Sequence, residues 1–189
     1  EEHGDVAAAD VGELGGEGRV MRFDLDGGVK VLGSGYAIPN GWGFTPDLKR
    51  VYFTDSKPRN LYLFDYDRRT GDLSNRRVFA EVPLSEGVPD GMAVDAEGHV
   101  WTAVWFGGRL KRYAPDGRLE REVRFPARQT SAVCFGGDDL GDLYVTTSAT
   151  ALADPLKPPG YDVEAAPRGG GLYALRIEGI RGRAQFRSR

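Results

Sequence analysis

The stretch VPDGMAVDAEGHVWTAVWFGGRLKRYAPDG, residues 88–117, contains three short apolar runs separated by turn-forming residues. Runs rich in valine, tryptophan and tyrosine, with Pro, Asp and Gly between them, are typical of consecutive antiparallel β-strands. No segment of the chain longer than a turn repeats its apolar residues at the spacing of an amphipathic helix. The stretch therefore predicts three strands in a row. Asp116-Gly117, like Asp26-Gly27 earlier in the chain, is predicted to be a plain hairpin turn.

The same order of strands recurs along the chain. A first type of strand begins polar and ends in an acidic turn, and it starts at Asn40, Asp90 and Thr130. A second, third and fourth type follow in most repeats: VYFTDS (51–56), VWTAVW (100–105) and LYVTTS (143–148); LYLFDYD from 61, LKRYAPDG from 110 and LYALRI from 172; LSNRRVF (73–79) and LEREVRF (119–125). The segment VMRFDLDGG from Val20 matches the third type, and the VKVLG after it matches the fourth.

The repeat has the length of a propeller blade. The second strands start at Val51, Val100 and Leu143, which are 49 and 43 residues apart. Four antiparallel strands in roughly 40–50 residues are the signature of a β-propeller, whereas a β-sandwich would not repeat the same strand types in the same order. We predict an all-β propeller, present here as an incomplete set of about four blades. The proline-rich segment 149–171 is predicted to be a loop across one face.

The start of the first strand in each repeat is a candidate metal site. Asn40, Asp90 and Thr130 hold the same predicted position in three successive blades, and equivalent positions in a propeller converge on its axis. An amide, a carboxylate and a hydroxyl are oxygen ligands that suit Ca²⁺, Mg²⁺ or Mn²⁺ and are acceptable to Zn²⁺. Asn-Gly and Asp-Gly are also favourable turn dipeptides, so spacing alone leaves both interpretations open.

Composition excludes several functions. The net charge is −3, so no overall field attracts nucleic acid or an anionic membrane, and no apolar run is long enough to span a bilayer. The single cysteine, Cys134, has no internal disulfide partner and is predicted to pack in the core. No signal-like segment occurs, so we expect a cytoplasmic protein whose partner is a small molecule, with no indication of its oligomeric state.

Several segments resemble the regucalcin/gluconolactonase family, also called senescence marker protein or luciferin-regenerating-enzyme-like. The resemblance runs from Gly18 to the C-terminus and is carried by IPNGWGFTPDLKRVYFTDS, FDYDRRTGDLSNRRVF, the stretch 88–117 and TSAVCFGGDDLGDLYVTTSA. It implies a six-bladed propeller that hydrolyses sugar lactones with one divalent ion, Ca, Zn, Mn or Mg, at its axis. It also implies that Asn40 and Asp90 are metal ligands and that Asp90 is the proton acceptor.

The chain departs from the family pattern at its start. The family's third protein ligand is a glutamate in an early Glu-Gly-Pro motif, and this sequence has no such motif. The resemblance therefore implies that residues 1–17 are a loose segment or the remnant of an earlier blade. Residues 18–189 would be the C-terminal blades, about two-thirds, of a single propeller domain.

Three functions stay open on the sequence. The first is a lactonase; the others are a non-catalytic, calcium-binding regulatory propeller and an inactive fragment without the N-terminal blades. An incomplete ring leaves apolar flanks uncovered. For the 189-residue chain alone we therefore expect weak binding of divalent metal, no measurable lactone hydrolysis, and marginal stability or self-association.

Overall fold

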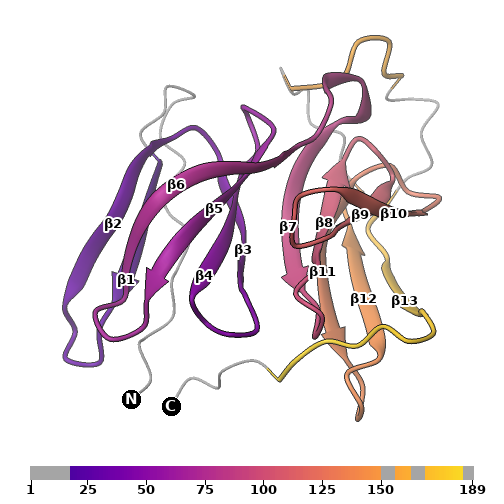
Figure 1. Ribbon diagram of the computed structural model, residues 1–189. Coiled ribbons are helices and arrows are strands. Elements are labelled where there is room, and N and C mark those ends of the chain that lie inside the picture. The colour runs from indigo at the N-terminus through magenta and orange to yellow at the C-terminus, as the bar shows by residue number, and fades with distance from the viewer. Residues whose placement is uncertain (1–17, 150–155, 163–168, 185–189) are drawn as a thin grey trace.

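The computed structural model describes residues 18–149, 156–162 and 169–184, and these form almost only antiparallel β-sheet (Figure 1). Sheet A contains β1 (Gly18–Phe23) and β2 (Val29–Tyr36). Sheet B contains β3 (Pro39–Phe44), β4 (Arg50–Asp55), β5 (Asn60–Asp67) and β6 (Asp72–Glu81). Sheet C contains β7 (Val88–Val94), β8 (Val100–Trp105), β9 (Arg109–Tyr113) and β10 (Leu119–Arg124), and sheet D contains β11 (Thr130–Gly136), β12 (Asp142–Thr147) and β13 (Leu172–Arg176).

The strand types occur in the predicted order. Within every sheet, each strand pairs with its neighbour in sequence, and β3, β7 and β11 each form one edge of their sheet. These three edge strands lie side by side, with β7 between β3 and β11 (Figure 1). One 3₁₀ turn, η1 (Leu84–Glu86), precedes β7, and no described segment is a helix that could cross a membrane.

The predicted hairpin turns are confirmed. Gly27 and Gly117 adopt φ values of 86° and 88°, a region that glycine enters without steric cost. Each turn closes with a backbone hydrogen bond, from Gly27 N to Asp24 O at 2.9 Å and from Gly117 N to Ala114 O at 2.8 Å.

The core lies between the sheets rather than within one of them. Because successive side chains of a strand point to opposite faces, β8 is buried on both sides: Val100 and Val104 pack toward sheet B, and Trp101 and Ala103 pack toward sheet D. This explains why VWTAVW is apolar almost throughout instead of alternating. Sheets A and B share a third cluster that contains Val20, Tyr36, Val51, Phe53 and Phe64.

The interface between sheets C and D overturns one expectation. Val133 points into the apolar cluster with sheet C, so the next residue, Cys134, points to the opposite face of sheet D. Cys134 is exposed and does not pack in the core as predicted. The strand alternates as predicted, but an alternating pattern does not show which of the two faces of the strand is covered.

Two further segments join the sheets at opposite ends. The described part of the insertion packs on the end where β7 starts, with Leu156 and Tyr161 beside Val88 and Phe106. This agrees with a loop across one face; residues 150–155 and 163–168, like the predicted 1–17 segment, lie outside the described residues. The segment after β13 crosses the turns at the other end: Arg181 O accepts from Ala96 N, Gly182 N donates to Leu140 O, and Arg183 Nη1 donates to Thr45 O, at 2.8, 2.8 and 3.3 Å.

Candidate metal and substrate site

The Asn-Gly and Asp-Gly pairs are strand residues, not turns. Asn40-Gly41 lies inside β3 and Asp90-Gly91 lies inside β7, each at a break in the pairing register with the next strand. A β-carbon on Gly41 would come within 2.6 Å of Asp90 O, and one on Gly91 within 2.8 Å of the Ala132 β-carbon. The two glycines are therefore required because the edge strands approach each other closely, and the turn interpretation is wrong here.

This close packing predicts a stability effect. Gly91→Ala should reduce the free energy of unfolding by about 1–3 kcal/mol, because the added methyl group must push β7 and β11 apart. Gly171→Ala is the matched control, since the nearest atom to its new β-carbon, in the Tyr173 ring, would lie 3.9 Å away. Urea unfolding of both variants measures the effect. Equal stability of the two variants would show that β11 does not pack against Gly91 as closely as described.

The bulges bring Asn40 and Asp90 together. The Asn40 side chain and the backbone N–H of Gly91 lie close enough to the Asp90 carboxyl to lower its pKa. Asn40 Nδ2 lies 3.3 Å from Ser56 Oγ at the end of β4. Irregularities of this kind in a β-strand commonly re-aim side chains near functional sites. The contact with Ser56 is made by the amide nitrogen of Asn40, so it leaves the amide oxygen available as a ligand.

Thr130, the third predicted member of the site, does not hold the position in β11 that Asp90 holds in β7. Thr130 is buried, and its hydroxyl donates to the backbone oxygen of Val104 at 2.8 Å. In the strand pairing Thr130 corresponds to Pro89, and the residue that corresponds to Asp90 is Ser131, whose backbone lies against Gly91. The Ser131 hydroxyl contacts Thr146 Oγ1 at 2.7 Å. Thr130 and Ser131 are adjacent and both polar, so the sequence alone does not show which of them corresponds to Asp90.

Asp90 has the character of an incomplete ion site. Burial raises the pKa of its carboxyl to about 7, although the hydrogen bonds from Asn40 and Gly91 lower it. No lysine or arginine of the described residues lies beside it to offset its charge. An amide oxygen and a carboxylate suit a divalent cation, which would supply that charge. The residues present therefore fit part of a divalent metal site, with two of its oxygen ligands.

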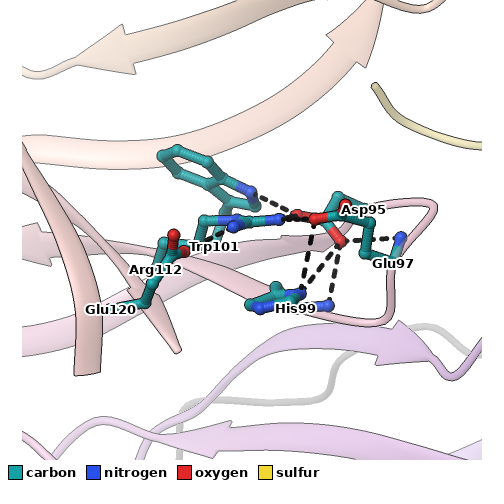
Figure 2. A network of polar contacts seen from close by, with 6 residues as sticks. All are labelled: Asp95, Glu97, His99, Trp101, Arg112 and Glu120. Carbon is teal, nitrogen blue, oxygen red and sulfur yellow. Dashed lines mark hydrogen bonds and ion pairs between the residues drawn. The ribbon is translucent and has the colours of Figure 1, made fainter. Parts of the chain in front are cut away.

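A second cluster that contains acidic residues has a structural role that needs no metal. Asp95, Glu97 and His99 bring ligand atoms within 4.8 Å of one another in the turn between β7 and β8 (Figure 2). Asp95 is fully buried, however, and its two oxygens already accept five hydrogen bonds, among them those from Trp101 Nε1 at 3.1 Å and Arg112 Nη2 at 2.6 Å. A cation would have to displace a buried guanidinium. This cluster is a structural clasp between the turn and β9.

The similarity of this structure to solved ones defines the class of fold. Regucalcin from Agrobacterium tumefaciens strain C58, described as a calcium-binding protein, superposes with a TM-score of 0.77 and 34% identity, covering 89% of this chain and 55% of that one. The fold is a β-propeller of the regucalcin type. Residues 3–149 match the SMP-30/Gluconolactonase/LRE-like region, and the chain belongs to this family.

Two relatives show how much of a family member is present. The pentonolactonase XacC of Haloferax volcanii is 42% identical over 171 residues, which is 90% of this chain and 58% of that protein. Human regucalcin is 36% identical over 150 residues, which is 79% of this chain and 48% of that protein. The chain thus spans about half the length of the curated relatives it matches.

Proposed function

We propose that this protein hydrolyses sugar lactones at a site where Asn40 and Asp90 hold a divalent cation at the propeller axis. One observation carries the proposal: adjacent edge strands place an uncompensated carboxylate in contact with a side-chain amide. The family membership and the lactonase among its relatives support the choice of reaction. Residues 18–189 would form the C-terminal blades of a single propeller domain.

The reaction needs a Lewis acid and a base. A divalent ion held by Asn40 and Asp90 would polarise the carbonyl group of the lactone. Asp90 would accept a proton from the water molecule that attacks the carbonyl carbon. The ester bond between this carbon and the ring oxygen then breaks, the ring oxygen takes up a proton, and the open hydroxy acid leaves. Asn40 would keep the Asp90 carboxylate in place through its amide hydrogens.

The ligand count leaves room for other groups. Ca²⁺ binds about six to eight oxygens, of which Asn40 and Asp90 would supply two or three. Ser131 holds the position in the next sheet that corresponds to Asp90, and its hydroxyl would add a polar group beside the proposed metal site. The candidate ions are Ca²⁺, Zn²⁺, Mn²⁺ and Mg²⁺.

A non-catalytic, calcium-binding propeller is the second candidate, because the same two ligands would serve it and one solved relative is described as a calcium-binding protein. The test uses the protein expressed from its complete coding sequence. Hydrolysis of gluconolactone and pentonolactones is measured after chelation and after each ion is restored. Metal-dependent turnover supports the lactonase. Calcium binding by calorimetry without turnover of any lactone supports the second candidate. If the protein shows neither metal-dependent turnover nor calcium binding, both candidate functions are contradicted.

The contact between Ser56 and Asn40 predicts a smaller effect. Ser56→Ala should weaken metal binding by about tenfold, because groups that orient a ligand typically contribute that much. Ser74→Ala, on the exposed part of β6, is the control and should change nothing. The readout is the metal concentration that gives half-maximal activity. An unchanged value for Ser56→Ala would mean that Asn40 is held by its other neighbours.

A further inference from the structure

A pocket lies apart from Asn40 and Asp90. Its volume is about 310 Å³, and it is lined by η1, the β8–β9 turn, the end of β10 with the loop that follows, and the segment 158–161. Three arginines line this pocket: Arg109, Arg124 and Arg128. None of the residues proposed for lactone hydrolysis lines it.

The charges around this pocket do not balance. Arg109 lies 3.6 Å from Glu86 and 3.3 Å from Glu122, and the buried Lys111 pairs with the same two carboxylates. These two cations and two anions neutralise one another. Arg124 and Arg128 are the remaining cations, and within the described parts of the chain neither has an ion-pair partner.

The strand register places like charges opposite each other. Arg124 on β10 is the direct cross-strand neighbour of Arg109 on β9. Like charges in such a pair are destabilising unless an anion lies between or beside them. Guanidinium groups also present several donors in a planar fork that matches phosphate and carboxylate oxygens. Because Arg109 already pairs with Glu86 and Glu122, Arg124 is the member of this pair whose charge lacks a counter-ion among the described residues.

The far wall of the pocket is held in place. Gln129 is 3% exposed, and its Nε2 donates to the Tyr161 hydroxyl at 3.1 Å, which leaves the hydroxyl hydrogen available for another acceptor. The Tyr161 ring packs edge-on against Phe106 with their centroids 4.9 Å apart. Arg128 lies over the same ring, 5.4 Å from its centroid. The buried residues Gln129 and Phe106 thus orient Tyr161, and Arg128, which is exposed, lies over the ring of Tyr161.

We propose that this pocket binds a small metabolite through a phosphate group, with Arg124, Arg128 and Tyr161 as donors. A phosphate monoester carries close to two negative charges at neutral pH, which matches the excess of two cations. The pocket is larger than phosphate alone requires, so the rest of a sugar-sized molecule has room beside Pro158 and Phe125. The inference does not depend on the proposed lactone hydrolysis.

The test is calorimetric titration of the protein with glucose 6-phosphate, inorganic phosphate and glucose at constant ionic strength. Both phosphates are expected to bind and glucose is not. Arg124→Gln and Arg128→Gln should each weaken binding by about tenfold or more, because each removes charge-assisted hydrogen bonds. Tyr161→Phe should weaken binding less, since one neutral donor is lost.

Arg121→Gln is the matched control. This substitution removes the same charge from the same strand as Arg124→Gln. Arg121, however, lies opposite Arg112 in the register, on the other face of sheet C. It should change the affinity by less than about twofold. Equal losses from Arg121 and Arg124 would show a general electrostatic effect and overturn the proposal, as would the absence of phosphate binding to the unaltered protein. Thermal unfolding of each variant checks that it is folded.

Discussion

Asp90→Asn, in the protein expressed from its complete coding sequence, should lower lactone turnover by about 10³-fold, the usual contribution of a general base. Asparagine has nearly the same shape, so the contact with Asn40 can be kept while the charge and the proton acceptor are lost. Metal affinity should fall as well, because the amide replaces the anionic ligand. The protein should stay folded, since the change removes a half-buried, uncompensated carboxylate.

Asp116→Asn is the control for this variant. It lies in an Asp-Gly turn that looks equivalent in sequence, but its carboxylate accepts from Arg118 N on the exposed surface. Turnover and metal binding should be unchanged. Steady-state kinetics with a range of metal concentrations measures both quantities. If the two aspartates were equally important, or equally unimportant, the assignment of Asp90 as ligand and base would be wrong.

The second large effect concerns the clasp around Asp95. Asp95→Ala should reduce the free energy of unfolding by about 3–5 kcal/mol, because it leaves the buried Arg112 without its main counter-charge. The side chain of Arg112 is 4% exposed and that of Asp95 is 0% exposed, so water cannot replace the lost contacts. The Trp101 indole N–H and two backbone N–H groups of the turn would lose their acceptor too.

Asp65→Ala provides the comparison. Its pair with Arg77, at 3.2 Å, joins side chains that are each 42% exposed, and such pairs contribute about 0–1 kcal/mol. Urea unfolding of both variants gives the two losses in free energy. A loss for Asp95→Ala no larger than that for Asp65→Ala would contradict the description of the turn as a clasp. Glu97 and Glu120 also pair with Arg112 and would then have to hold it by themselves.

The sequence predicted the strands and their order well, and for a physical reason. A strand that packs on one or both faces repeats its apolar residues with a fixed period, and the sheets here repeat the same strand types in the same order. The equivalence of Asn40 and Asp90 followed from that repeat. Their contact depends on Gly41, whose role in a close approach cannot be distinguished in sequence from a role in a turn.

Other features could not be predicted because they depend on the exact register or on long-range contacts. Thr130 and Ser131 differ by one position in the strand, and only the pairing with β12 decides which of them corresponds to Asp90. The partners Asp95 and Arg112 are 17 residues apart and meet because β9 returns beside the β7–β8 turn. Cys134 has a well-defined alternation, but nothing in its own strand shows which face is covered.

The segment that joins the turns of sheets B, C and D has a consequence for synthesis. Residues 181–183 follow every strand that they connect, so all three sheets leave the ribosome before the contacts to Thr45, Ala96 and Leu140 are possible. Each sheet consists of sequence-adjacent strands and can form as it emerges, as domains and subdomains commonly do during translation. Until residue 183 is released, the nascent sheets are held in order by their apolar contacts and by polar contacts such as that of Thr130 with Val104. The release of residues 181–183 therefore adds the polar contacts that connect the turns of three sheets already formed.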